Sequence, residues 1–291
     1  MMKLKLLFFL LLCLSTSVFS QETQVEADTV SIEKDKKFKF SVDLVNRYLW
    51  RGQCWGGNYA AVQPSVDYRV TPKLTLGFWG TTNFKNDHFY PDGISENKGY
   101  QEIDFYVYYK ITDFLEVQVW DYYWPSVSKV EGVKNGYFNY GKNGTKSVDA
   151  MLCFDFSKGY RYPFNATLST LVAGNDFRYD SNGGNPKQNF TTYFEIGYTF
   201  TLFENHKSIW LQDIDIDPMV GVIFNNKAEY YTYADYNKVS FVDLGLTVSK
   251  QFELGYGIKM PIMLTYTHNA SSKNTEFFGK NFLVTTLTFG Y

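Results

Sequence analysis

Residues 256–269 read YGIKMPIMLTYTHN and decide the fold. Large apolar side chains alternate there with glycine, lysine, proline and threonine. Successive side chains of a β-strand point to opposite faces, so one face of this segment suits lipid and the other suits water. The lipid-like face holds Tyr256, Ile258, Met260, Ile262, Leu264 and Tyr266, and the other holds Gly257, Lys259, Pro261, Thr265 and Thr267. This pattern is typical of a strand in a transmembrane β-barrel.

The same period of two recurs in twelve segments from Phe38 onward. An even number of strands is usual for a bacterial single-chain barrel. We therefore predict an all-β protein, a transmembrane antiparallel β-barrel of about twelve strands, of the bacterial outer-membrane type. The predicted strands are 38–52, 60–70, 74–84, 102–110, 115–124, 146–156, 164–174, 191–202, 214–225, 239–250, 256–269 and 282–291.

The connections alternate in length. Short links at 71–73, 111–113 and 251–255 alternate with long polar links at 85–101 and 126–145. Barrels of this type have short periplasmic turns and long external loops, so both chain ends are expected on the periplasmic side. The final predicted strand ends in Tyr291, which resembles the terminal strand through which the barrel-assembly machinery recognises its substrates.

The residues before the barrel divide into two parts. Residues 1–20 have lysines before an apolar run and small residues near the end, which predicts a secretory signal peptide. Residues 21–37 are polar and predict a flexible leader, so the barrel itself is assigned to residues 38–291. Of the three cysteines, Cys13 lies in the signal, and Cys54 and Cys153 are expected to be free rather than joined.

Composition excludes several classes of function. The chain has 291 residues, a formal net charge of −2, 20% charged residues and 19% aromatic residues. That balance excludes a nucleic-acid-binding protein and a disordered chain. The expected partners are outer-membrane lipid, the assembly machinery and a small hydrophilic solute.

One stretch resembles a known family. Residues 42–84 contain Tyr48, Arg51, Gln63 and the sequence GFWG at 77–80 in the order seen in the TorF-type porin family. Residues 102–106, EIDFY, resemble that family's next strand. The resemblance covers about residues 42–125, and it implies an outer-membrane barrel that acts as a porin.

The alternation also predicts which polar side chains face the lumen. Because the acidic residues outnumber the basic ones, we expect a pore that mildly prefers cations or neutral solutes. The alternative is that many of these charges pair between strands, for example Arg47 or Arg51 with Asp67, and only hold the barrel together. The predicted pore-lining residues are Asp43, Arg47, Arg51, Asp67, Arg69, Glu102, Asp104, Tyr106, Tyr108, Glu116, Asp149, Asp155, Glu195, Asp215, Asp217, Asp243 and Lys259, with Lys110 beside them.

Aromatic residues leave two interpretations open. One interpretation of Trp79, Tyr106, Tyr108, Trp120 and Tyr122 is a stacking track for sugars or nucleosides. The other, which is favoured, is that they fill space or mark the membrane-interface belts where Trp and Tyr collect. The loop aromatics either fold inward as a constriction or pack loop against loop. These loop residues are Phe89, Tyr90, Tyr137, Tyr140, Tyr230, Tyr231, Tyr233 and Tyr236.

Catalysis and cofactors find little support in the sequence. The histidines are His88, His206 and His268, and none has a nucleophile at a motif spacing. The cysteines and histidines lack the clustered spacing of a metal site, and there is no phosphate-binding loop, so neither metal nor cofactor is expected. The sequence therefore predicts a porin-like channel for small hydrophilic solutes. The alternative is a non-conducting barrel acting in adhesion or assembly through its Tyr-rich loops, and a barrel enzyme ranks third.

Overall fold

The computed structural model describes residues 37–83, 99–125, 132–160, 162–180, 182, 184–224, 231, 239–256, 258–271, 275 and 278–290. The predicted signal peptide, nearly all of the leader, His88, Tyr291 and the loop aromatics Phe89, Tyr90, Tyr230, Tyr233 and Tyr236 lie outside these residues. In the described part of the chain no helix is long and apolar enough to cross a membrane.

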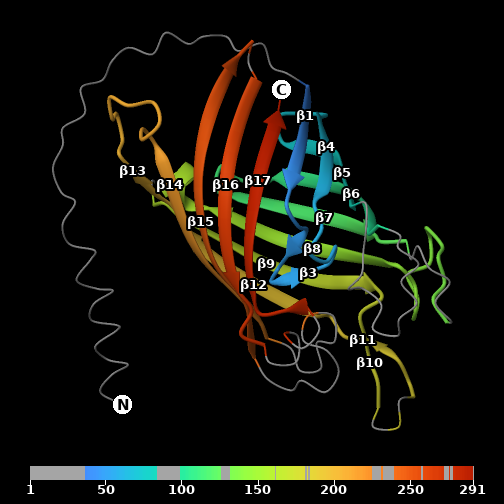
Figure 1. The fold of residues 1–291 in the computed structure, drawn as a ribbon. Coiled ribbons are helices and arrows are strands. Elements are labelled where there is room, and N and C mark those ends of the chain that lie inside the picture. The colour runs from blue at the N-terminus through green and yellow to red at the C-terminus, as the bar shows by residue number, and fades with distance from the viewer. Residues whose placement is uncertain are drawn as a thin grey trace. The chain divides into compact units, whose positions relative to one another are not determined.

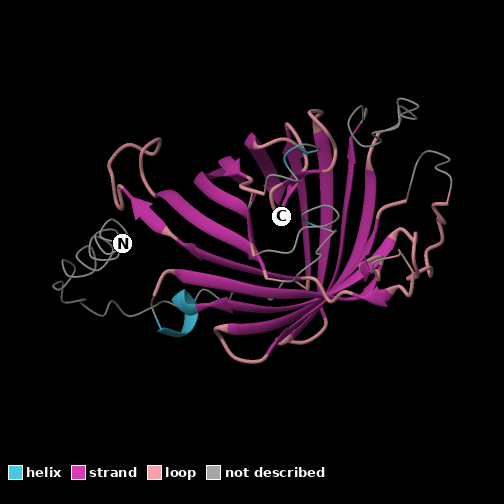
Figure 2. Ribbon diagram, turned by 90° about the horizontal axis from the view of Figure 1, so that it is seen from below, coloured by secondary structure: helices cyan, strands magenta, loops and turns pink. Residues whose placement is uncertain are grey.

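Antiparallel strands close into one barrel (Figure 1). Around the wall the order is β12-β9-β8-β7-β6-β5-β4-β1-β17-β16-β15-β14, and β14 pairs back to β12. The short β13 also pairs with β14 and continues β12 after a break at Thr199, so the wall has twelve strands. The predicted fold class is confirmed. Figure 2 shows that strand dominates the described chain.

The wall strands nearly coincide with the predicted segments. They are β1 (Phe38–Val45), β4 (Ala61–Arg69), β5 (Leu74–Asn83), β6 (Gln101–Lys110), β7 (Leu115–Tyr123), β8 (Lys146–Asp155), β9 (Phe164–Gly174), β12 (Thr192–Tyr198), β13 (Phe200–Leu202), β14 (Ile214–Ile223), β15 (Ser240–Gly255), β16 (Ile258–His268) and β17 (Asn281–Gly290). Outside the wall are the small hairpins β2 (Leu49–Trp50) with β3 (Gln53–Cys54) and β10 (Phe177–Arg178) with β11 (Lys187–Gln188), and the helical turn α2 (Phe156–Tyr160).

The outer surface is apolar in the way that a lipid-facing wall requires. On β6, Ile103, Phe105 and Val107 are exposed while Asp104 and Tyr106 between them are buried. Exposed apolar side chains recur on β1, β16 and β17. A row of large apolar side chains facing outward, with polar ones inside, is the reverse of a water-soluble protein and is the pattern of a membrane barrel.

The short link predicted at 251–255 is strand, because β15 continues to Gly255 and pairs there with β16. One predicted strand is also wrong in its extent. The first was expected to span residues 38–52, but β1 ends at Val45 and residues 46–60 leave the wall. The alternation of apolar and polar residues continues past Val45, so it does not reveal the departure. The barrel therefore has two different ends. The short-turn end carries the links 70–73, 111–114 and 156–163, and the long-loop end carries residues 46–60 and the β10–β11 hairpin.

Candidate functional site

Residues 48–57, which we call the plug, fold into the lumen at the long-loop end. Trp50 packs its ring 5.7 Å from that of Tyr122 on β7 and 5.4 Å from that of Tyr231. Cys54 packs against Phe282 and Val284 of β17. Since β7 and β17 are five strands apart in a wall of twelve, a segment that touches both must lie inside the barrel.

A tight turn holds the plug in place. Arg51 and Gly52 have positive φ values of 46° and 75°, a conformation that glycine adopts without steric cost. The Gly52 carbonyl accepts a hydrogen bond of 2.9 Å from the Asn269 side chain, and a side chain at position 52 would collide with the Val242 carbonyl. The Asn83 amide donates a second bond to the Gly56 carbonyl.

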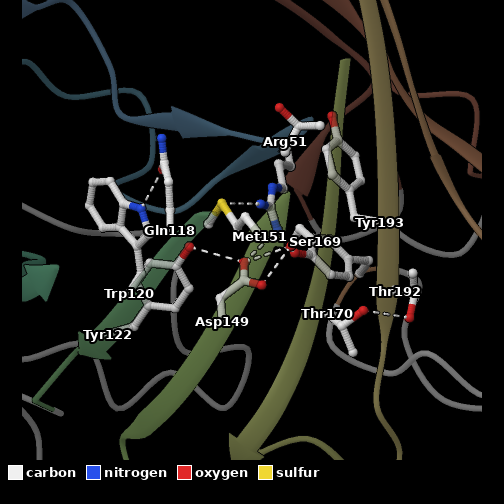
Figure 3. A network of polar contacts seen from close by, with 12 residues as sticks. Arg51, Gln118, Trp120, Tyr122, Asp149, Met151, Ser169, Thr170, Thr192 and Tyr193 are labelled. Carbon is white, nitrogen blue, oxygen red and sulfur yellow. Dashed lines mark hydrogen bonds and ion pairs between the residues drawn. The ribbon is translucent and has the colours of Figure 1, made fainter. Parts of the chain in front are cut away.

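A buried ion pair connects the plug to the wall (Figure 3). The Arg51 guanidinium lies 3.1 Å from Asp149 Oδ2 on β8, and their side chains are 9% and 0% exposed. Asp149 also accepts hydrogen bonds from Ser169 at 2.7 Å and from the Tyr122 hydroxyl at 3.1 Å. A buried charge is tolerated when it is paired and hydrogen-bonded, and this carboxylate meets both conditions.

Aromatic rings surround the same arginine. Its guanidinium carbon lies 4.7 Å from the ring centroid of Trp50 and 4.5 Å from that of Tyr193, and it donates to the Tyr231 hydroxyl. Such cation–π contacts strengthen when water is excluded. Arg51 thus adds an ion pair and cation–π contacts to the hydrogen bonds that hold the plug at Gly52 and Gly56.

The proposed alternative pairing of Arg47 or Arg51 with Asp67 is wrong. Arg47 donates to Asn58 at 2.8 Å, and Asp67 accepts from the Tyr106 hydroxyl at 2.7 Å. The physical reason is that residues 46–60 leave the wall, which carries both arginines away from β4, where Asp67 lies. The carboxylate that Arg51 reaches is 98 positions away along the chain.

A water-accessible cavity of about 740 Å³ lies between the plug and the short-turn end. Its lining includes residues of the short turns, such as Thr112, Asp113 and Lys158, and also plug residues Trp50 and Arg51. The cavity therefore runs from the short-turn mouth to the plug. Six carboxylates and four basic side chains line it: Asp43, Asp104, Asp113, Glu116, Asp155, Glu195, Arg47, Arg51, Lys110 and Lys158.

Several of these charged side chains form ion pairs or hydrogen bonds within the protein. Lys158 pairs with Asp155 at 2.9 Å at the mouth, and Arg51 pairs with Asp149. Near the short turn before β7, Glu116 accepts from Gln118 at 2.7 Å, and further along the lumen Glu195 accepts from the Tyr193 hydroxyl at 2.6 Å. The neutral donor leaves the charge of Glu195 uncancelled, whereas Glu116 lies directly across the strand pair from Lys110.

The structure places the predicted lumen residues in three groups. Those lining the cavity are Asp43, Arg47, Arg51, Asp104, Glu116, Asp155 and Glu195. Those bonded to neighbouring side chains are Asp67, Glu102, Tyr106, Asp149, Asp215 and Asp217, with Tyr108 stacked on Tyr106 and Asp243 buried near the plug. Arg69 and Lys259 are exposed towards the short-turn end. A role in conduction stays a prediction for each of them.

The lumen aromatics mostly pack on one another. The rings of Tyr106 and Tyr108 stack at 4.5 Å, and Trp120 lies 4.3 Å from Tyr106. Mutual stacking uses the ring faces that a sugar would need, which favours the space-filling interpretation. Among the loop aromatics, Tyr231 turns inward and is fully buried against the plug. Its partners Trp50 and Tyr193 were not identified from sequence, because no short motif connects them.

A second cluster, which we call the outer cluster, lies on the lipid-facing side of β7 and β8, the two strands that carry Tyr122 and Asp149. Lys146 of β8 is fully buried, and its Nζ lies 2.5 Å from Asp121 of β7. Loop residues Tyr137 and Tyr140 cover the pair, and each donates to Asp121. The Tyr137 ring centroid lies 3.7 Å from Lys146 Nζ.

The surroundings of Tyr140 in the outer cluster and of Cys54 in the plug raise the pKa of both groups. Burial and the Asp121 carboxylate raise the pKa of Tyr140 to about 12. In the plug, burial raises the pKa of the Cys54 thiol to about 11. Cys54 and Cys153 are both free, as expected from the sequence.

His206 and His268 each have a polar neighbour at Nδ1. His206 Nδ1 accepts from the Ser208 backbone at 3.0 Å, and His268 Nδ1 lies 2.8 Å from Asn281 Oδ1. No group of three or more potential metal ligands occurs in the described part of the chain. That the protein is not an enzyme remains a prediction.

No family model and no curated protein matches the chain, so the TorF resemblance gains no support. Solved structures of outer-membrane barrels are similar. An outer membrane channel from Pseudomonas putida F1 is 10% identical, with 91% of this chain and 99% of that one covered and a TM-score of 0.47. The NanC porin is 11% identical, with coverages of 86% and 97% and a TM-score of 0.43. LpxR from Salmonella typhimurium is 10% identical, with coverages of 87% and 99% and a TM-score of 0.41. These identities and TM-scores support no conclusion about function, so the function is inferred from the residues of this chain.

Proposed function

We propose that the protein is a porin-like channel of the bacterial outer membrane that passes small hydrophilic solutes and mildly prefers cations. The observation that carries this proposal is the cavity of about 740 Å³ inside a closed barrel, lined by more carboxylates than basic groups. An acidic wall raises the local concentration of cations and lowers that of anions. The TorF resemblance of residues 42–125 implies the same class.

Orientation and partners belong to the same proposal. The first and last wall strands, β1 and β17, pair with each other, and Phe38 and Gly290 both lie at the short-turn end (Figure 1). Short turns face the periplasm in barrels of this type, so both termini are assigned to that side. The exposed apolar outer wall suits membrane lipid, and the last strand is the segment offered to the barrel-assembly machinery.

The test is single-channel recording of the purified protein in a planar bilayer, with the reversal potential measured in a salt gradient. Stable conductance steps with a reversal potential of the cationic sign are expected. Glu116→Gln should reduce that potential, because Glu116 lines the cavity. Glu204→Gln is the matched control, because Glu204 lies exposed in the turn after β13 and does not line it. A clear anion preference would overturn the charge argument.

The plug favours a second candidate function. The plug crosses the lumen at the long-loop end, between β7 and β17. If it closes the lumen permanently, the barrel conducts nothing, and its function then lies in its external loops, in adhesion or assembly. A silent protein that is folded by circular dichroism would favour this second candidate. Conductance in the wild type would exclude it.

A further inference from the structure

Residues 132–145, which we call the outer loop, form part of the connection between β7 and β8 at the long-loop end and lie against the lipid-facing side of the wall. The Tyr137 ring centroid lies 5.2 Å from that of Tyr123 and 6.5 Å from that of Phe105. Phe105 belongs to the apolar outer surface of β6 and is 49% exposed. The outer loop therefore occupies a place beside the wall that lipid would otherwise fill.

Hydrogen bonds within the outer loop fix its shape. The Lys134 N–H donates to the Asn143 carbonyl at 3.0 Å, and the Asn139 side-chain amide donates to the Lys134 carbonyl at 3.2 Å. The two tyrosine hydroxyls of the outer cluster then join the loop to Asp121 of β7. The exposed side chains of the loop are thus held in defined positions beside the wall.

Phe138 presents an apolar ring in this position. Its ring centroid lies 5.1 Å from that of Tyr137, and its side chain is 84% exposed. Val133 of the same loop is 37% exposed. A phenyl ring this exposed is unfavourable in water, but beside a lipid-facing wall it lies within reach of acyl chains. The tyrosines of the outer cluster indicate the same level, because tyrosine collects at the membrane–water interface.

The charged residues of the outer loop are two lysines. Lys134 and Lys142 are exposed, and residues 132–145 contain no acidic residue. Neither lysine forms an ion pair within the described residues, and Lys142 Nζ lies 4.7 Å from the ring centroid of Tyr179. The hydrogen bond from Lys134 to Asn143 brings the backbones of the two lysines close together, since Asn143 follows Lys142. Cations without acidic partners beside an exposed phenyl ring are typical of segments that bind anionic lipid.

We propose that the outer loop binds the phosphate group of an anionic lipid of the outer leaflet, with Phe138 among the acyl chains and Lys134 and Lys142 on the phosphate. Lysine is a common phosphate ligand in proteins. The inference rests on the proposed orientation, because that orientation places the long-loop end on the external side of the membrane. It also accounts for the outer cluster, since the loop shields the charges of Lys146 and Asp121 on the outer wall from hydrocarbon.

The test is native mass spectrometry of the full protein released from detergent micelles and titrated with dioleoyl phosphatidate or dioleoylglycerol. The two lipids share their acyl chains, and the second lacks the phosphate. Phosphatidate is expected to bind more tightly by about tenfold or more. Lys134→Gln and Lys142→Gln should each weaken phosphatidate binding by about fivefold and leave dioleoylglycerol binding unchanged. Phe138→Ala should weaken the binding of both lipids.

Lys187→Gln is the matched control, because Lys187 is exposed in the β10–β11 hairpin at the same end of the barrel. It should leave the binding of both lipids unchanged. A loss in this control as large as that in Lys134→Gln would show attraction to general surface charge and overturn the site. Equal binding of the two lipids by the wild type would overturn it as well. Displacement of phosphatidate by an equimolar concentration of inorganic phosphate would indicate a free-anion site and reject the lipid.

Conductance recording separates this inference from the channel proposal. A preference for phosphatidate in a protein that conducts nothing would retain the lipid site and reject the channel. Conductance in a protein without that preference would retain the channel and reject the lipid site.

Discussion

The plug anchor and the outer cluster use the same two strands from opposite faces. Inside, Asp149 of β8 holds Arg51 of the plug, and Tyr122 of β7 donates to it. Outside, Asp121 of β7 pairs with Lys146 of β8 and is covered by a loop. Asp121 and Val148 are paired residues, so the two charged groups lie back to back on one piece of wall.

The difference between them is access to water. Asp149 is fully buried, whereas Asp121 is 25% exposed. An ion pair whose partner stays buried after mutation costs far more to break than one whose partner can be hydrated. The β7–β8 wall thus fixes the plug firmly and the outer loop loosely.

The largest expected effect comes from removing each cation in turn. Arg51→Met leaves the Asp149 carboxylate buried without its charge partner and should lower the free energy of unfolding by about 3–5 kcal/mol. Lys146→Met leaves Asp121 partly hydrated, with two tyrosine donors, and should cost about 1 kcal/mol or less. Urea unfolding in micelles, followed by tryptophan fluorescence, measures both. Equal losses would contradict the comparison.

The sequence predicts the wall better than it predicts the plug. The wall follows from local alternation of apolar and polar residues. For example, β5 begins at Leu74 and β9 at Phe164, which are the first residues of the predicted segments. The plug residues Leu49, Trp50 and Arg51 also alternate, so periodicity assigns them to a strand. Their departure depends on contacts with Asp149, Asn269 and Phe282, which are distant in sequence. Pairing of that kind has no local signal.

The second-largest expected effect tests whether the tight turn at Arg51 and Gly52 holds the plug. In a Cys153→Ser background, Cys54 is the thiol that reports on the plug, and it is buried. Gly52→Ala places a methyl group against the Val242 carbonyl and should raise the rate of Cys54 labelling by a maleimide severalfold. The control is Gly132→Ala in the outer loop. Gly132 also has a positive φ, of 85°, but an added methyl group meets only Asn143, at 3.7 Å.

Comparing the Cys54 labelling rates of the two variants separates the effect of backbone strain from the effect of the collision at position 52. Both substitutions impose the cost of a left-handed alanine, about 1–2 kcal/mol. Only Gly52→Ala adds a collision with the Val242 carbonyl, which displaces the plug from its contacts with the wall. If Gly132→Ala accelerated Cys54 labelling equally, the plug would not be held by this turn.

The smallest effect concerns the outer loop and alkaline pH. An unfolded tyrosine titrates near about pH 10, while Asp121 and burial raise the pKa of Tyr140 to about 12. The neutral hydroxyl donates to Asp121, so its contribution to stability is present below about pH 10 and is lost as the pH rises to about 12. Ultraviolet difference titration of wild type against Tyr140→Phe should show one late-ionising phenol. Asp121→Asn should move that phenol to lower pH, because it removes the carboxylate that opposes ionisation. A wild-type difference spectrum without this late component would show that the loop does not rest on the outer wall.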